Sequence, residues 1–433
     1  MRHRLFIFNS NSKVRSVIWI CLFLVMVLVA MNLLANKMEV KDSEKKYYDY
    51  FNTKDEIDVV FLGTSHMIDG ILPTILYEKY GITSYNLANH GELMPTSYWV
   101  LQNALQYHTP KVVVIDLFVV NAEGTYYNKA FSHCSLDAFP LTSIKLQAIW
   151  DLFNDNETRM EFINNFNTYH SRWNEAFTLG DMSYIPHYGG AELLIGAEPI
   201  ASPLTVGTAV DETMTEGMLY FEKILDFCDR RGLQVVCTNL PYSGYEEKIG
   251  ATNYAKQILK ERNTPCIDFQ FDADIIGLNL NADFRDSHHL NVAGAAKATN
   301  YVGEFLRERY FSDNVEKNSM NYEDLCRKAR GDIEYLLGDE ADINHVLMLT
   351  DAFSYDMILE IGPYEKFGSH ELTQSYLRDM GFEVFIPESS EISQRYSTFG
   401  DYAEAETKRN TAKIWIYDQN GELVTEREFL IEE

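Results

Sequence analysis

The sequence predicts an α/β domain with a parallel sheet, preceded by a membrane-spanning helix and followed by a small α/β or β-rich C-terminal domain. Three observations lead to this prediction. Short apolar runs alternate with helical patterns over residues 56–312, as in sheets whose parallel strands are joined by helices. One long apolar run lies near the N-terminus, and the alternation changes character after about residue 312.

The N-terminal apolar run extends from Val17 to Ala35, and Asn32 is its one strongly polar member. About 19 residues at 1.5 Å per residue nearly cross the ~30 Å hydrocarbon core, whereas a signal peptide usually has roughly 7–15 apolar residues. The length favours an uncleaved single-pass anchor within residues 1–36, with a cleaved signal as the alternative. Basic residues before the run predict a cytoplasmic N-terminus and an extracytoplasmic remainder, although lysines also follow it. The charged, Tyr-rich residues 37–55 are predicted to form a stalk.

The α/β alternation begins directly after the stalk. Buried strands are predicted at residues 57–63, 82–88, 111–120, 233–240 and 265–269. Helices are predicted at residues 73–80, 95–107, 211–231, 245–262 and 292–308. Residues 121–210 interrupt the rhythm and are rich in aromatic and Asn residues, so we interpret them as a mostly helical insertion.

The C-terminal region, residues 320–433, is predicted to be a separate small domain. Its expected elements are a helix at 321–337, a strand at 345–351, a helix at 370–381 and a strand at 382–386. A hairpin should follow, because two strand-like runs flank Gln419-Asn420-Gly421 and Asn-Gly is typical of a type I′ turn.

The composition excludes some classes of function. The formal net charge of −27 gives a surface that repels phosphate backbones, so we predict no nucleic-acid partner. Such an acidic surface is most often simply solvated. The alternative is that it repels an anionic surface polymer, or that cations bridge it to such a polymer. The six cysteines have no CxxC and no metal-like spacing, which predicts buried free thiols rather than a disulfide scaffold.

Gly63-Thr64-Ser65-His66 follows the first predicted strand. A serine there lies at the carboxyl edge of a parallel sheet, where ligands bind in open α/β folds. The next helix would offer backbone N–H groups to an oxyanion. A serine hydroxyl needs a base to become a good nucleophile, so the chain must supply a histidine from elsewhere.

Asp286-Ser287-His288-His289 precedes the last predicted helix and supplies that histidine. An Asp and a His three residues apart around a turn can share one hydrogen bond, which orients the imidazole and stabilises its protonated form. Each motif alone has an ordinary structural explanation, a plain turn for Ser65 and a capping acid for Asp286. Their joint position at one sheet edge favours the triad Ser65, His289 and Asp286.

Gly63-Thr64-Ser65-His66 resembles the first block of the SGNH/GDSL hydrolase superfamily, and the segment from Asp286 to Asn291 resembles its last block. The resemblance implies a flavodoxin-like three-layer domain with Ser65 as nucleophile, Asp286 as acid and His289 as base. Tyr85-Asn86-Leu87-Ala88-Asn89-His90-Gly91 resembles the second block, so the oxyanion donors implied are the N–H groups of Ser65 and Gly91. The third block, Gly-x-Asn-Asp, is missing. Asn89 and Asn121 are the alternatives for its side-chain donor, and neither is chosen.

The anchor and the block Gly63-Thr64-Ser65-His66, which resembles a Gly-Ser-Ser-His form of the first block, make the chain similar to membrane-tethered members of the superfamily. Examples are D-alanyl-lipoteichoic acid transfer proteins and alginate-type O-acetyltransferases. This resemblance implies an extracytoplasmic serine acyltransferase or esterase that acts on a cell-surface polysaccharide or teichoic acid. It requires no metal or other cofactor, and a membrane O-acyltransferase would be a fitting partner. The alternative is a non-catalytic polysaccharide-binding or assembly subunit, suggested by the missing block.

Several other sequence features have both a functional and a purely structural interpretation. The side chains of His66, His288, His289 and Asp286 could instead form a metal site, which would leave the serine unexplained. The segment Tyr169-His170-Ser171-Arg172-Trp173 could form a lid or simply pack on the surface. Asn156-Glu157-Thr158 matches a glycosylation acceptor, a triplet that is common by chance. The aromatic residues of the C-terminal region could bind carbohydrate or belong to its core.

Overall fold

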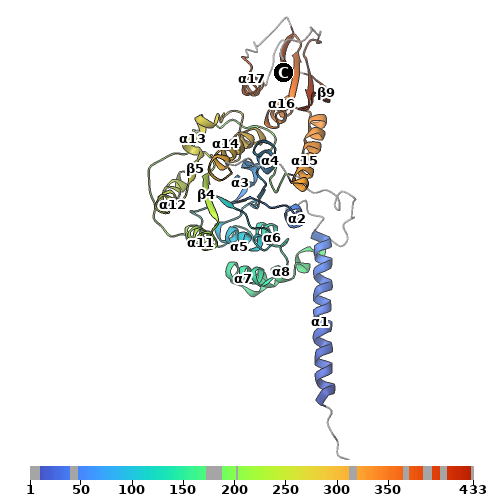
Figure 1. Cartoon of the computed structure of the whole chain (residues 1–433), viewed down its shortest axis with the longest axis vertical. Helices are drawn as coiled ribbons and strands as arrows, with labels where there is room; N and C mark the ends of the chain where they lie inside the picture. Colours follow the sequence, from blue (N-terminus) through green and yellow to red (C-terminus); the bar gives the residue numbers. More distant parts are fainter. Residues whose placement is uncertain are drawn as a thin grey trace, which may run out of the picture. The chain divides into compact units, whose positions relative to one another are not determined.

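The computed structural model describes residues 10–39, 47–171, 188–200, 203–311, 319–363, 370–383, 393–399 and 407–430. It comprises two compact units (Figure 1). One unit holds Met1–Lys45 and Leu136–Ile185, which are the N-terminal helix and part of the insertion. The other holds Lys46–Ser135 and Pro186–Glu433, which contain the central sheet and the C-terminal region.

The central sheet has five strands, all parallel, in the order β2-β1-β3-β4-β5. The strands are β1 (Val59–Leu62), β2 (Ser84–Asn86), β3 (Val112–Asp116), β4 (Gln234–Asn239) and β5 (Cys266–Asp268). Every residue of β1 and β3 is buried, as the continuous apolar runs require when helices cover both faces of a sheet. The order is flavodoxin-like, with its reversal point between β1 and β3, so the predicted α/β class is confirmed.

The helices between these strands lie where the sequence predicted them, within a few residues. They are α4 (Pro73–Tyr80), α5 (Met94–Ala104), α11 (Glu216–Arg231), α12 (Ile249–Glu261) and α14 (Val292–Tyr310). Two short helices were not predicted, α3 (Ser65–Gly70) and α13 (Phe269–Ile276). Helix α3 has six residues, too few for a helical period to show, and α13 follows β5 directly, so its apolar residues merge with the run of the strand.

The segment predicted as a stalk includes a short helix, α2 (Tyr48–Asn52). Tyr47 and Tyr50 of this segment are fully buried. The Tyr47 hydroxyl donates to the carbonyl of Leu87, and the Tyr50 hydroxyl donates to that of Ala104, both at 3.0 Å. Residues 47–52 therefore pack on the sheet domain, while residues 40–46 of the predicted stalk lie outside the described part.

The C-terminal region forms an antiparallel sheet with helices. The helices are α15 (Met320–Asp339), α16 (Ile343–Ala352) and α17 (His370–Asp379). The sheet has the order β7-β6-β8-β9, from β6 (Asp356–Ile361), β7 (Gln394–Ser397), β8 (Thr411–Tyr417) and β9 (Leu423–Leu430). The small C-terminal α/β part of the fold prediction is thus confirmed.

Two local predictions for this region were wrong. Residues 345–351 belong to helix α16 and not to a strand. A short apolar run fits a buried helix as well as a strand, and the side chain of Asp342 caps this one by accepting from the N–H of Asn344. The central strand β6 was missed. Of the strand predicted at 382–386, Phe382 and Glu383 are not in a strand, and the remainder lies outside the described residues.

The hairpin of β8 and β9 is confirmed, but its turn is not of type I′. Gly421 has φ 79°, while the described non-glycine residues with positive φ are Asn263, Ser354 and Asn410, so Asn420 is not left-handed. A type I′ turn needs positive φ at both central residues. The carboxylate of Asp418 instead accepts from the N–H groups of Asn420 and Glu422, which holds a longer turn.

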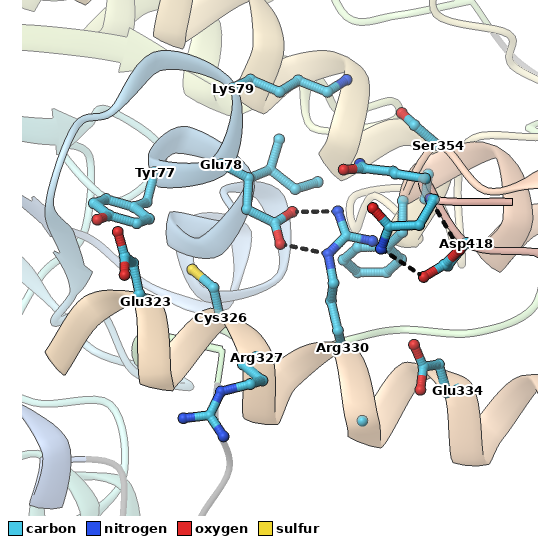
Figure 2. A pocket seen from close by; sticks show the side chains of 16 residues that line it. Tyr77, Glu78, Lys79, Glu323, Cys326, Arg327, Arg330, Glu334, Ser354 and Asp418 are labelled. Atoms are coloured by element: carbon cyan, nitrogen blue, oxygen red, sulfur yellow. Dashed lines mark hydrogen bonds and ion pairs between the residues drawn. The ribbon is translucent and has the colours of Figure 1, made fainter. Parts of the chain in front are cut away.

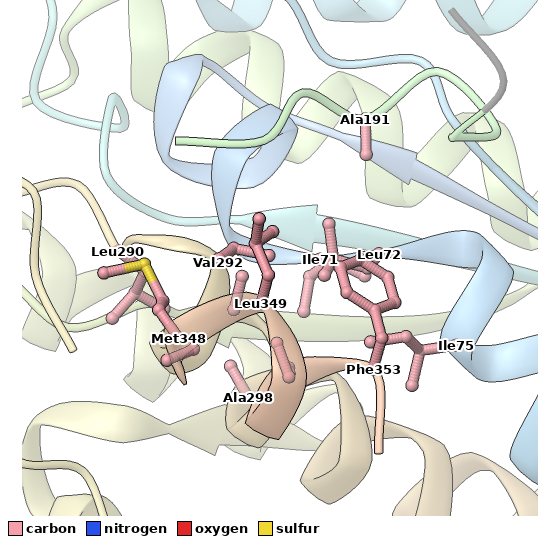
Figure 3. Packing of buried hydrophobic residues seen from close by; sticks show 14 of the residues in the cluster. Ile71, Leu72, Ile75, Ala191, Leu290, Val292, Ala298, Met348, Leu349 and Phe353 are labelled. Atoms are coloured by element: carbon pink, nitrogen blue, oxygen red, sulfur yellow. The ribbon is translucent and has the colours of Figure 1, made fainter. Parts of the chain in front are cut away.

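The C-terminal region shares a hydrophobic core with the sheet domain. Leu349 and Phe353, in and just after α16, pack in one cluster with Val292 and Ala298 of α14 and with Ile71 (Figure 3). A second link joins α4 to α15, where the Arg330 guanidinium contacts both carboxylate oxygens of Glu78, at 2.6 and 2.9 Å. This ion pair lies in a cavity of about 620 Å³ between the two helices (Figure 2).

The other unit contains α1 (Ser10–Glu39) and three helices of the insertion, α7 (Ser143–Leu152), α8 (Asn156–Ile163) and α9 (Phe166–Tyr169). With α6 (Lys129–Leu136), they make residues 129–169 mostly helical, as predicted. The stretch 188–210, where described, has no helix, and Arg172 and Trp173 lie outside the described residues. Within α1, Lys13–Ala35 has a mean hydropathy of 2.8, enough for a single-pass anchor or a signal sequence.

Candidate active site

Ser65 lies on a sharp turn from β1 into α3. Gly63 between them has φ 156°, and a Cβ atom there would come within 3.0 Å of Cβ of Met67 and 3.1 Å of Cβ of Asp116. Only glycine fits that space without displacing β3 or α3. Ser65 is the first residue of α3, so its N–H has no partner within the helix. The turn therefore presents a half-buried hydroxyl beside a free helix N-terminus.

Asp286 and His289 lie on a tight loop before α14. An isolated antiparallel bridge between Phe284 and Leu290 closes the loop, and the N–H of Arg285 donates to the carbonyl of His289 at 2.9 Å. One oxygen of Asp286 accepts from the N–H groups of His288 and His289, both at 2.9 Å. These bonds hold the aspartate side chain inside the loop and leave its second oxygen for the imidazole.

The three predicted triad residues meet in a continuous chain of hydrogen bonds. His289 Nδ1 lies 2.8 Å from Asp286 Oδ2, and His289 Nε2 lies 2.8 Å from Ser65 Oγ. Both distances allow direct proton transfer and orientation of the base. Ser65 follows β1 and His289 precedes α14, 224 residues apart in sequence, and only the sheet edge brings them together.

The loop keeps Asp286 ionised. Burial by itself would raise the pKa of this carboxyl, but hydrogen bonds from the His288 backbone and the His289 ring outweigh burial and lower its pKa below the usual value. An ionised carboxylate is the form that fixes the imidazole tautomer and stabilises the imidazolium.

His66, next to the nucleophile, is fully buried. Its ring stacks on Phe118 with ring centres 3.5 Å apart. Burial, followed by the nearby charges of His289, His288 and Lys248, lowers its pKa well below the ordinary value, so it is neutral. Neither ring nitrogen has a hydrogen-bond partner among the described residues.

An aromatic wall that the sequence did not reveal lines this side of the triad. It is formed by Phe118, Tyr242, Tyr245 and His288. The ammonium of Lys248 lies 3.9 Å from the Phe118 ring centre and donates to the Phe118 carbonyl and to Asn121 Oδ1. This bond engages the side-chain oxygen of Asn121 and not its Nδ2 donor. Their positions in the sequence could have indicated this wall. Phe118 follows β3, and Tyr242 and Tyr245 follow β4, so all three lie at the carboxyl edge of the sheet.

The loop after β2 carries Gly91 and Asn89. Gly91 has φ 58°, and a Cβ atom there would come within 2.3 Å of the Phe131 ring. The N–H of Asn89 donates to the carbonyl of Gly63 at 3.3 Å, which ties this loop to the nucleophile turn. Asn89 is buried, and its Nδ2 has no acceptor in the part of the chain that the structure describes. A buried donor without an acceptor, on a loop bonded to Gly63, fits the role of the missing third block.

Two groups of side chains among the described residues could hold a metal ion, Asp286 with His288 and His289, and Asp69 with His90 and Glu192. In the first group both ring nitrogens of His289 are already engaged, by Asp286 and by Ser65. The triad accounts for the serine, which a metal site would leave unexplained. His66, a predicted alternative ligand, belongs to neither group. In the second group, His90 Nε2 lies 2.8 Å from Glu192 Oε2.

No family model matches the sequence, and no curated protein matches it. Among solved structures, a protein of Desulfitobacterium hafniense DCB-2 provisionally assigned to the G-D-S-L lipolytic family is similar at 12% identity and a TM-score of 0.31, over 57% of this chain and 99% of that one. A protein of Bacteroides fragilis NCTC 9343 provisionally assigned as an acylhydrolase is similar at 10% identity and a TM-score of 0.31, over 62% of this chain and 97% of that one. The fold stated above rests on the sheet topology of this chain and not on these likenesses.

Proposed function

We propose that this protein is an extracytoplasmic serine esterase or acyltransferase that acts on O-acyl groups of a cell-surface polysaccharide or teichoic acid. The observation that carries the proposal is the hydrogen-bonded chain from Ser65 through His289 to Asp286, with two bonds of 2.8 Å. A merely structural serine, histidine and aspartate would have no reason to be arranged as nucleophile, base and orienting acid at the reversal point of the sheet.

The geometry supports a two-step acyl transfer. Ser65 Oγ attacks the acyl carbonyl carbon while His289 Nε2 takes the hydroxyl proton, and a tetrahedral intermediate forms. His289 then gives that proton to the leaving alkoxide oxygen, which breaks the ester bond and leaves an acyl-serine. Water, in an esterase, or an acceptor hydroxyl, in a transferase, attacks the acyl-serine with His289 again as base. Asp286 holds the imidazole in position throughout.

The negative oxygen of the intermediate needs donors. The N–H of Ser65 at the start of α3 is one, and the N–H of Gly91 is proposed as the second. We add the side chain of Asn89 as the third, because its buried Nδ2 lacks an acceptor among the described residues and its backbone is bonded to Gly63. A donor that is not already engaged costs little to turn toward a developing oxyanion.

The location and substrate rest on the N-terminal segment and on the resemblance of the motifs. The apolar stretch of α1 with its basic flank supports a single-pass anchor with a cytoplasmic N-terminus. The GSSH-like block with such an anchor resembles enzymes of surface-polymer O-acylation, and a membrane O-acyltransferase as acyl donor would favour transfer over hydrolysis. The non-catalytic alternative predicted a Ser65–His289 separation far beyond ~3.5 Å, and the observed 2.8 Å does not favour it.

A fluorophosphonate serine probe tests the proposal on the full chain in detergent or lipid. The protein should be labelled once, at Ser65, and Ser65→Ala should abolish the labelling. Ser287→Ala is a matched control, because Ser287 lies exposed in the same loop as the base and should leave labelling intact. Unchanged labelling of Ser65→Ala would disprove the assignment. Incubating the acyl-enzyme with a glycan acceptor or with water alone then separates transfer from hydrolysis.

A further inference from the structure

Positions along the anchor helix α1 show how deep the residues packed against it would lie in a bilayer. Its apolar stretch ends at Ala35. At a rise of 1.5 Å per residue, Val25 lies about 15 Å along the helix from Ala35 toward the N-terminus, and Leu33 lies about 3 Å from it. The hydrocarbon core of a bilayer is ~30 Å thick. With a cytoplasmic N-terminus, the residues from Val25 to Leu33 occupy the outer leaflet.

The insertion meets the anchor at this depth. A cavity of about 450 Å³ has one wall from α1 and the other from the insertion. The lining residues of α1 are Val25, Leu28, Val29, Asn32 and Leu33. The lining residues of the insertion are Asp137, Ala138, Phe139, Pro140, Leu141, Lys145, Phe162, Ile163 and Asn165. Helix α9 packs against α1 within the same unit. Part of the insertion therefore lies below the outer surface of the hydrocarbon core.

Several polar groups of the insertion have partners within it, as burial away from water requires. The ammonium of Lys145 is buried and donates to the carbonyls of Asp137 and Phe139, at 3.2 and 2.8 Å. The hydroxyl of Tyr169 donates to Asp137 Oδ2 at 2.9 Å. The first turn of α8 is capped by Asp155, which accepts from the N–H of Thr158 at 2.7 Å.

Several large apolar side chains of the insertion are exposed. Leu141, Trp150 and Met160 are 48%, 54% and 53% exposed. The Arg159 guanidinium lies 5.3 Å from the centre of the Trp150 ring, and Trp is enriched at membrane interfaces. Contact with water would leave this apolar area unfavourably hydrated, whereas contact with lipid would bury it.

We propose that helices α7, α8 and α9 form a lipid-embedded module in the outer leaflet, with Leu141, Trp150 and Met160 in contact with lipid. The inference rests on the anchor role of α1 given under the proposed function. The occupant is lipid and not an acidic or basic protein surface. Residues 136–171 contain five acidic and two basic residues, so headgroup attraction would contribute little and apolar burial would drive the contact.

The test uses the full chain, one copy per nanodisc of zwitterionic phosphatidylcholine, so that neither a partner nor a second copy can cover the face. Hydroxyl-radical footprinting should oxidise Trp150 and Met160 several-fold less than Met214 and Met320. Those two methionines are 50% and 82% exposed and belong to the other unit. A lipid-soluble carbene reagent should give the opposite pattern and should also label Trp19 in α1.

The outcomes separate this inference from the proposed function. Lipid labelling of Trp19 together with full oxidation of Trp150 and Met160 would overturn the lipid-embedded module and leave the anchor in place. An unlabelled Trp19 would overturn both the anchor and the module. Fluorophosphonate labelling of Ser65 in the same sample reports the catalytic assignment independently of either result.

Discussion

The backbone N–H of Asn89 donates to the carbonyl of Gly63, so the loop after β2 is fixed to the turn that carries Ser65. The side chain of Asn89 is buried, and its Nδ2 has no acceptor among the described residues. Two loops that follow neighbouring strands in this way make one preorganised site.

Asn89→Ala should lower kcat by about 10²–10³ with little change in KM, as expected for loss of one oxyanion donor. Asn89→Asp should be at least as poor, because a carboxylate cannot donate and repels the developing charge. Asn121→Ala is the matched control and should stay within a few-fold of wild type, since the side-chain oxygen of Asn121 accepts from Lys248 and this residue is not one of the proposed oxyanion donors. Initial rates with an aryl acetate and equal thermal midpoints would establish the effect. A rate for Asn89→Ala equal to that of the control would exclude the donor role.

Asp286→Asn should lower kcat by up to ~10⁴, because an amide favours the wrong tautomer of His289. The lowered pKa of Asp286 also predicts a stability effect. A depressed carboxyl pKa stabilises the fold above the unfolded value of about 3.9, and this contribution is lost as pH falls toward the lower folded value. The variant should therefore lose less unfolding free energy than wild type below about pH 4. Parallel acid-induced unfolding curves for the two proteins would contradict this expectation.

His66 should make the fold acid-sensitive in a higher pH window. Its folded pKa lies well below 6.5, so the unfolded chain binds the proton first, and stability falls as pH drops below about 6.5. His66→Phe keeps a ring against Phe118 and removes the titrating group, so its unfolding midpoint in urea should change less between pH 7.5 and pH 5. Equal losses in both proteins would show that another group causes the acid sensitivity.

Arg330→Ala should reduce the unfolding free energy by about 1–3 kcal/mol, because it leaves the half-buried carboxylate of Glu78 without its bidentate partner. Arg330→Lys should recover part of this loss, since a lysine keeps the charge but not the forked geometry. Arg327→Ala is the control, and its loss should be within ~0.5 kcal/mol because Arg327 pairs with Asp324 at the surface. Chemical denaturation of the full chain measures all three. A loss for Arg330→Ala no larger than for the control would contradict the stabilising role.

The sequence by itself determined the α/β class, the position of the parallel strands and the apolar N-terminal helix, and it predicted Ser65, Asp286 and His289 as the candidate triad. These follow from local patterns: an apolar run with buried-strand length, a glycine turn after a strand, and an acid three residues before a histidine. The same local patterns could not divide a short apolar run, so residues 345–351 were assigned to the wrong element and β6 and α13 were missed.

Only the tertiary structure decided which side chains surround the triad. Phe118, Lys248, Tyr242 and Asn89 come from loops after three different strands, and nothing in their local sequence marks them as neighbours. Their proximity is set by the strand order, which places the ends of β1, β2, β3 and β4 at one edge. The hydrogen-bond state of each side chain depends on that packing and is not encoded in any short segment. Examples are Nδ2 of Asn89, which has no acceptor among the described residues, and Oδ1 of Asn121, which accepts from Lys248.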